Sequence, residues 1–224
     1  LIEDKKYTLE EIFVHSHNNL SFHLSPAVKE KINTSRKVLE AALASGKTIY
    51  GVNTGFGKLS QVKISDSQVS HLQKNLLLSH AAGVGNPVKP EIVRLMLVLK
   101  VLSLSKGYSG VRLELVEKLI EFINHNLIPK VPEKGSVGAS GDLAPLSHMS
   151  LALIGEGEIA TGSGYLDAQK VLSNSGVSPI QLFFKEGLAL INGTQFSTAY
   201  GVDSLCRLYR LAKLADIAGA LSVE

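Results

Sequence analysis

The sequence has few of the residues that build disulfides, metal clusters or nucleic-acid surfaces. Among 224 residues there is no tryptophan and a single cysteine, Cys206. One cysteine excludes an internal disulfide and a cysteine-cluster metal site, and we expect Cys206 to be a small core residue on a helix. The net charge of +3 comes from dispersed lysine and arginine without a basic run, so no nucleic-acid partner is expected.

Long apolar runs are missing as well. The most apolar stretch, residues 92–104, contains Arg94 and Lys100 and is too short to span a bilayer, so we expect a buried helix and no membrane partner. No secretory segment is visible at Leu1. With 45% hydrophobic and 19% charged residues, the composition is typical of a soluble globular protein of one or two domains, which we expect in the cytoplasm.

Several histidines lie close together near the start of the chain. His15 and His17 lie close to His23, but no carboxylate or cysteine spacing supports a site there, and we expect no metal. His71 and His80 fall on one expected helix, about 900° of rotation apart, so they point to opposite faces and cannot share an ion. His71 is expected at the surface or in the core.

Apolar periodicity predicts a mainly helical fold. Thr8 and Glu11 form a capping box for a short first helix, and Ser25 before Pro26 is an N-cap followed by an N1 proline. The last element begins near Thr194 and has no breaker until about Ile217, a length that indicates one member of a long-helix bundle. The other expected helices cover residues 26–46, 65–81, 90–106, 116–127 and 142–154, and only residues 158–167 are typical of a hairpin.

The tripeptide Ala139-Ser140-Gly141 can turn its own backbone into an electrophile. If the amide nitrogen of Gly141 attacks the carbonyl carbon of Ala139, a five-membered ring closes, and loss of water and of the Ser140 hydroxyl leaves an exocyclic methylidene. Such a ring is a Michael acceptor, which no ordinary side chain is. Glycine and alanine suit the compressed turn that closure requires. For the bare tripeptide the alternative is a flexible loop between two helices.

Two helix starts are expected beside this tripeptide. Residues 142–145 are typical of a first helical turn, and Asn192-Gly193-Thr194 precedes the last long helix. Two positive dipole ends would make the ring more electron-poor. Alternatively, both loops only cap their helices. Asn192 can be an N-cap, a hydrogen-bonding group for the ring carbonyl or the substrate carboxylate, or both.

Several blocks of the chain resemble the aromatic amino acid ammonia-lyases. In the order in which that family has them, they are YGVNTGFG (50–57), LQKNL (72–76) with SHAAG (79–83), GSVGASGDLAP (135–145) and LINGTQ (190–195). The similarity extends from about Tyr7 to Glu224 and is greatest to the histidine ammonia-lyases. Family members are longer, so the chain resembles their N-terminal half.

The resemblance implies a mainly α, fumarase/aspartase-like fold in which an N-terminal helical domain with a small hairpin leads into a long-helix bundle, truncated here. Residues 1–190 would be the domain that carries the Ala139-Ser140-Gly141 electrophile. Residues 191–224 would be the first long helix of the central bundle. The resemblance also implies a homotetramer at full length.

The activity implied by the resemblance is elimination of ammonia from L-histidine to give trans-urocanate. The electrophile would be a 4-methylidene-imidazol-5-one ring, with no metal and no nucleotide. Since other groups of the family's site lie in the second half and in neighbouring subunits, this chain alone is expected to be inactive. The residues implied for catalysis are Ala139, Ser140, Gly141 and Tyr50, and those implied for substrate binding are His80, Asn192 and Ser79.

Other functions stay open at this point. Within the same family they are a tyrosine or phenylalanine ammonia-lyase or an aminomutase, and outside it a non-catalytic helical fragment. The glycine spacing of residues 51–57 matches neither nucleotide-binding signature. Residues 138–142 lack the last glycine of a hydrolase nucleophile motif. Tyr50 has a structural alternative too, as a tyrosine packed beneath a loop.

Overall fold

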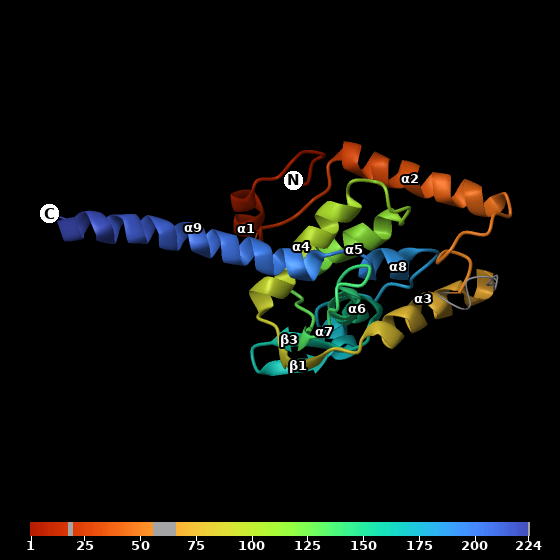
Figure 1. The fold of residues 1–224 in the computed structure, drawn as a ribbon. Coiled ribbons are helices and arrows are strands. Elements are labelled where there is room, and N and C mark those ends of the chain that lie inside the picture. Colours follow the sequence, from red (N-terminus) through yellow and green to blue (C-terminus); the bar gives the residue numbers. More distant parts are fainter. Residues whose placement is uncertain (18–19, 56–65, 224) are drawn as a thin grey trace.

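The computed structural model describes residues 1–17, 20–55 and 66–223, and this part of the chain is mainly helical, as expected (Figure 1). The helices are α1 (Leu9–His17), α2 (Pro26–Ala44), α3 (Asp66–His80), α4 (Pro90–Leu104), α5 (Leu113–Asn124), α6 (Leu143–Leu151), the 3-10 helix η2 (Ala152–Ile154), α7 (Ala168–Asn174), α8 (Glu186–Ile191) and α9 (Gln195–Val223). The strands are β1 (Val84–Pro87), β2 (Pro132–Lys134), β3 (Glu158–Thr161) and β4 (Gly164–Asp167).

The first two helices begin where the local sequence predicts. The backbone N–H of Thr8 donates to Glu11 Oε2 at 2.8 Å, and the N–H of Glu11 donates to Thr8 Oγ1 at 3.1 Å, so the capping box is reciprocal. Ser25 caps α2 by accepting from the N–H of Val28 at 3.4 Å. The N-cap expected for α3, Ser65, lies outside the described residues.

Helix α4 lies at the centre of the core. It packs against α1, α5 and α9, and apolar side chains are buried around most of its circumference, which confirms the buried helix expected over this stretch. Lys100 is buried within it and is only 1% exposed. Over the described ranges, no helix combines the length and apolar character that a membrane crossing requires.

Two small antiparallel sheets accompany the helices. β3 and β4 form the expected hairpin, with Thr161 paired to Gly164 across the turn. A second sheet, which the sequence did not predict, pairs β1 with β2. All four residues of β1 are exposed and two of them are Gly85 and Pro87, so the strand lacks the alternation of apolar and polar residues by which strands are recognised. This second sheet links the segment that follows α3 to the segment that precedes Ala139.

Some helix boundaries differ from the prediction. α4 ends at Leu104, and α6 ends at Leu151, from which η2 carries the chain on to Ile154. The short helices α7 and α8 were missed, since seven and six residues are too few to show a periodic stripe. The long last helix is confirmed, although it passes the expected end at Ile217 and spans 29 residues.

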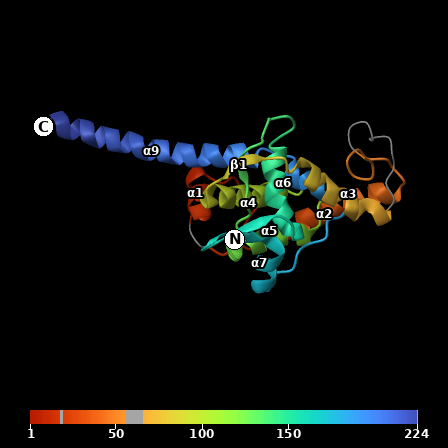
Figure 2. The ribbon, with the colours of Figure 1, turned by 90° about the horizontal axis from the view of Figure 1, so that it is seen from below.

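Helix α9 has a packed half and an unpacked half. Phe196, Ala199, Val202 and Cys206 are buried, and the helix packs against α4 and α1, so Cys206 is the core residue expected. Every residue from 207 to 223 is exposed. Figures 1 and 2 show this half leaving the body of the molecule by itself.

Candidate active site

The Ala139-Ser140-Gly141 segment forms a tight turn with an unusual backbone. Ser140 has φ +64° and Gly141 has φ +115°, both in the region that favours glycine. The N–H of Asp142 donates to the carbonyl oxygen of Gly193 at 2.7 Å. A Cβ on Gly141 would lie 2.4 Å from that same oxygen, so only glycine fits here without a shift of the backbone.

Asn192 holds the turn from the other side. Its Nδ2 donates to the Ser140 carbonyl oxygen at 3.1 Å and to Ser140 Oγ at 3.0 Å. It ends α8 in an extended conformation, whereas α9 begins only at Gln195. The N-cap role for Asn192 is therefore wrong, because Asn192 is the C-cap of α8 and lies three residues before the start of α9, and its side chain contacts the tripeptide instead.

Asp142 joins the starts of α6 and α9 beside the turn. Its carboxylate is 2% exposed and accepts from Ser136 Oγ at 2.6 Å, from Ser197 Oγ at 2.7 Å and from the N–H of Ser197 at 2.8 Å. Although Asp142 occupies the N-cap position of α6, its side chain makes no cap bond there and instead satisfies the first turn of α9. Both expected helix starts thus lie next to Ser140.

Sequence reasoning missed this role of Asp142. An aspartate before a helix is a common capping signal, but the sequence does not say which helix it caps. Here the capped helix begins more than fifty residues later in the chain.

A cavity of about 460 Å³ opens beside the turn. It brings together Tyr50, His80, Ser140 and Asn192, which come from four separate segments of the chain. Ser79 does not line it, and its Oγ donates to the Leu76 carbonyl oxygen at 3.0 Å. The remaining lining is largely apolar, from Leu76, Ser103, Leu104, Tyr108, Ser109, Leu143, Lys185, Leu188, Ala189 and Ile191.

The imidazole of His80 is oriented by its own helix. Its Nδ1 lies 2.9 Å from the carbonyl oxygen of Leu76 and 3.2 Å from Ser79 Oγ. Because a carbonyl oxygen only accepts, this geometry assigns the proton of the neutral ring to Nδ1 and leaves Nε2 as an acceptor. Ser79 therefore contacts the imidazole of His80 and not the cavity itself.

Tyr50 lies at the start of a loop whose backbone is held by hydrogen bonds to its own side chains. Asn53 Oδ1 accepts from the N–H of Ile49 at 2.7 Å, and Thr54 Oγ1 accepts from the N–H of Gly51 at 3.2 Å, so both buried side chains serve the loop. Tyr50 itself is 59% exposed, and the packed-tyrosine alternative is wrong. The end of this sequence block, residues 56–57, lies outside the described residues.

Helix α8 is fixed on two sides. The carboxylate of Glu186, which is fully buried, accepts from Arg112 Nε at 2.9 Å, Arg112 Nη2 at 2.8 Å, the N–H of Arg112 at 3.1 Å and the N–H of Phe183 at 2.8 Å. On the side of α3, Gln73 Oε1 accepts from the N–H of Gly187 at 2.8 Å. These contacts set the helix that carries Asn192 against the helix that carries His80.

Two lysines near the cavity were also missed. Lys185 lines it from the N-cap of α8, where its φ of +70° is unusual for a residue with a side chain, and burial lowers its pKa. Lys100 Nζ donates to the carbonyl oxygen of Ala189 at 3.2 Å. For Lys100 the only available signal was a charge inside an otherwise apolar stretch.

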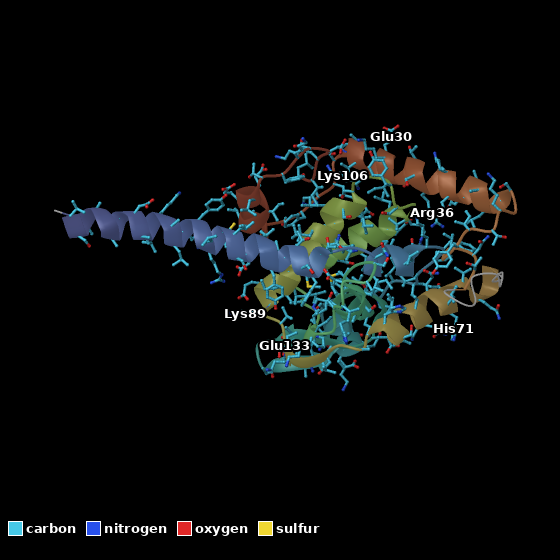
Figure 3. All side chains as sticks on the ribbon, in the orientation of Figure 1. Glu30, Arg36, His71, Lys89, Lys106 and Glu133 are labelled. Carbon is cyan, nitrogen blue, oxygen red and sulfur yellow. The ribbon has the colours of Figure 1, made fainter. Side chains whose placement is uncertain are left out.

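The histidines form no metal centre among the described residues, where no group of three or more histidine, cysteine, aspartate or glutamate side chains is arranged to hold an ion. The side chains of His15 and His17 lie outside that description. His71 is exposed on the outer side of α3 (Figure 3), whereas His80 lines the cavity, so the two point apart as expected.

Comparison with known proteins agrees with the resemblance seen in the sequence. Histidine ammonia-lyase of Alkaliphilus oremlandii is 46% identical over 224 residues, which cover 100% of this chain and 44% of that protein. The chain thus spans less than half the length of this curated relative.

Solved structures agree on the fold. Histidine ammonia-lyase from Trypanosoma cruzi superposes with a TM-score of 0.87 at 41% identity, over 95% of this chain and 41% of that one. Pantoea agglomerans phenylalanine aminomutase gives a TM-score of 0.87 at 34% identity, over 93% and 41%. The expected fold class, a helical N-terminal part with a small hairpin leading into a long helix, is confirmed. Since the sequence pattern of the family described as aromatic amino acid lyase also matches residues 7–224, the chain belongs to the aromatic amino acid lyase family.

Proposed function

We propose that this chain supplies the electrophile and part of the substrate pocket of an enzyme that eliminates ammonia from L-histidine to give trans-urocanate. One observation carries the proposal most. Asn192 donates to both the carbonyl oxygen and the hydroxyl of Ser140, in a turn that borders the same cavity as Tyr50 and His80.

The turn fits the 4-methylidene-imidazol-5-one ring that the family implies. Positive φ values at Ser140 and Gly141 fold the backbone back, and no Cβ obstructs Gly141. Ring closure joins the nitrogen of Gly141 to the carbonyl carbon of Ala139 and releases two waters, one with the Ala139 oxygen and one with the Ser140 hydroxyl. When formed, the ring supplies an electrophilic carbon that accepts a nucleophilic group of the substrate.

Asn192 has a continuing role in this proposal. The Ser140 carbonyl oxygen is retained on cyclisation, so the 3.1 Å hydrogen bond from Asn192 Nδ2 persists and draws electron density away from the adjacent carbons. The starts of α6 and α9, joined by Asp142, present positive dipole ends to the same region. Preorganised donors of this kind stabilise negative charge as it develops.

Tyr50 and His80 act on the substrate. Tyr50, exposed at the cavity, serves as an acid–base group for proton transfer from the substrate's β-carbon. The electrons of that C–H bond form the new double bond as the Cα–N bond breaks and ammonia leaves. His80 Nε2 accepts a hydrogen bond from the substrate imidazole.

His80 favours histidine over the aromatic alternatives within the family. A bound phenyl ring would cover Nε2 without offering it an N–H and would leave this acceptor unpaired, at a cost of about 1–3 kcal/mol. The serine hydrolase alternative finds no support, because the hydrogen-bond partner of Ser140 Oγ is the amide of Asn192, which cannot take up its proton.

The test uses the full-length protein and its intact mass. The unmodified protein should be lighter than its sequence by two water molecules and should release urocanate, whereas Ser140→Ala should keep its helical circular dichroism and lose both properties. Ser163→Ala, in the Gly-Ser-Gly turn of the hairpin, is the matched control and should change neither. Unchanged turnover in Ser140→Ala would refute the proposal.

Substrate choice has its own test. His80→Phe should lower turnover of histidine by about tenfold or more, as the lost hydrogen bond predicts. His71→Phe, on the exposed face of the same helix, should not change it. An unmodified protein that prefers tyrosine or phenylalanine would establish the alternative lyase or aminomutase activity instead.

The proposal extends to assembly and location. We propose a homotetramer in the cytoplasm, with residues 1–190 as the electrophile-bearing domain and residues 191–224 as part of the central bundle. The exposed half of α9 supports the assembly, since its apolar side chains have no cover within the described chain. The 224-residue chain alone should be inactive, because it spans 44% of its curated relative.

A further inference from the structure

Lys100 carries a charge into the apolar interior. It lies on α4, is 1% exposed, and is flanked along the helix by the buried side chains of Leu97 and Leu104. Burying an ammonium group is strongly unfavourable unless hydrogen bonds and opposite charge compensate it. Its compensating partners therefore indicate what the charge does.

One partner is the C-terminal end of α8. Lys100 Nζ donates at 3.2 Å to the carbonyl oxygen of Ala189. Ala189 lies in the last turn of α8, where carbonyl oxygens receive no hydrogen bond from an N–H of the same helix. Three residues later the chain reaches Asn192, whose amide holds Ser140. The ammonium thus contacts the backbone that positions this amide.

The other partner acts through its charge. Burial lowers the pKa of Lys100 to about 7, and the negative charge of Asp142 raises it. Asp142 directly follows the turn, and its N–H bonds to Gly193 on the α8 side. The direct contact of Lys100 is thus with the α8 side of the turn, through the carbonyl oxygen of Ala189.

We propose that Lys100 is a positioning residue for the electrophile: the hydrogen bond that its buried Nζ donates to Ala189 fixes the end of α8 and so holds Asn192 and Gly193 against the Ser140–Gly141 turn. The inference rests on the proposed function, because it concerns the turn that is to cyclise. Lys100 does not line the cavity, so the role proposed for it involves no contact with substrate.

A purely structural lysine would behave differently. Replacing a buried ionic group by an apolar side chain of similar volume is often neutral or stabilising. Lys100→Met should therefore keep or raise the melting temperature if the lysine only fills space. The positioning role predicts that this same variant loses ring formation although its fold is stable.

The experiment compares Lys100→Met, Lys100→Gln and Lys100→Arg in the full-length protein. The fraction of chains with the two-water mass deficit is measured only on folded, size-fractionated protein, together with kcat and KM. Lys118→Met is the matched control, because Lys118 Nζ also donates to a backbone carbonyl, that of Ser178 at 2.8 Å, away from the turn. If Lys100→Met fails to fold, Lys100→Gln answers the same question with a polar neutral side chain.

The expected result is a decrease of about tenfold in the fraction of chains with the two-water mass deficit for both neutral variants, as loss of a buried hydrogen bond from the lysine implies. In fully cyclised molecules kcat should decrease more than KM rises. Lys100→Arg should restore ring formation, and Lys118→Met should match the unmodified protein. Normal ring formation and kcat in both neutral variants would overturn the inference. An unmodified protein without any mass deficit would instead refute the proposed function itself.

Discussion

Glu186 offers a quantitative test of what holds α8 in place. Its pair with Arg112 and the exposed pair of Lys29 with Glu117 have the same closest N to O distance, 2.8 Å. Glu186 is 0% exposed, however, whereas the Lys29 and Glu117 side chains are 44% and 45% exposed. Burial and the four hydrogen bonds that Glu186 accepts therefore distinguish the two carboxylates.

The expected free energies differ accordingly. Glu186→Ala leaves a guanidinium and two backbone N–H groups without their acceptor, and breaking a buried pair costs about 3–5 kcal/mol. Because the Arg112 side chain is itself 23% exposed, water replaces part of the loss and the low end of this range, about 3 kcal/mol, applies. Glu117→Ala should cost about 0–1 kcal/mol.

Urea unfolding followed by far-ultraviolet circular dichroism provides the assay. With a slope of about 3 kcal/mol per molar, Glu186→Ala should lower the midpoint by about 1 M and Glu117→Ala by no more than about 0.3 M. Glu186→Gln, which keeps one acceptor oxygen, should fall between them. Equal shifts for the two alanine variants would show that Glu186 does not stabilise α8 as its contacts imply.

Three further predictions concern the turn, an acid-sensitive contact and the exposed helix. Gly141→Ala should fold with little ring formation by intact mass, because its Cβ would meet a backbone oxygen at 2.4 Å, whereas Gly162→Ala, in open space, should match the unmodified protein. Burial lowers the pKa of His148, whose Nε2 accepts from the N–H of Gly83 at 3.0 Å. The neutral imidazole therefore contributes stability above the unfolded-state pKa of about 6.5, and this stability is lost as the pH falls from there through the lower folded-state pKa. His148→Gln should flatten the decrease in urea midpoint between about pH 7 and 5, and an unchanged decrease would contradict this role of His148. The 224-residue chain should self-associate in light scattering through its exposed apolar helix, and Leu211→Glu should reduce this; a monomeric unmodified chain would exclude it.

Local signals were sufficient for most of the helices. The Thr8 capping box, the Ser25 cap and the hairpin turn at residues 162–164 depend on contacts within a few residues, and each was predicted correctly. The segments that line the cavity were found through the family motif, since no spacing rule brings Tyr50 and His80 together.

The missing parts depend on contacts between distant segments. Which helix Asp142 caps, and which carbonyl Lys100 reaches, is decided by how α4, α6, α8 and α9 pack, and a buried polar residue takes whatever partner that packing presents. The β1–β2 sheet likewise pairs segments separated by two helices and has no turn between its strands to announce it.

The hydrogen bond from Asn192 to Ser140 spans 52 residues, and this separation has a consequence in time. A ribosome that adds about 5–20 residues per second needs roughly 3–10 s to extend the chain from one partner to the other. During that interval the tripeptide exists without the amide and the carbonyl that fix its geometry. The proposed ring closure would therefore begin only after α8 has emerged and docked, and until then the nascent chain would carry an ordinary, unreactive peptide backbone at this tripeptide.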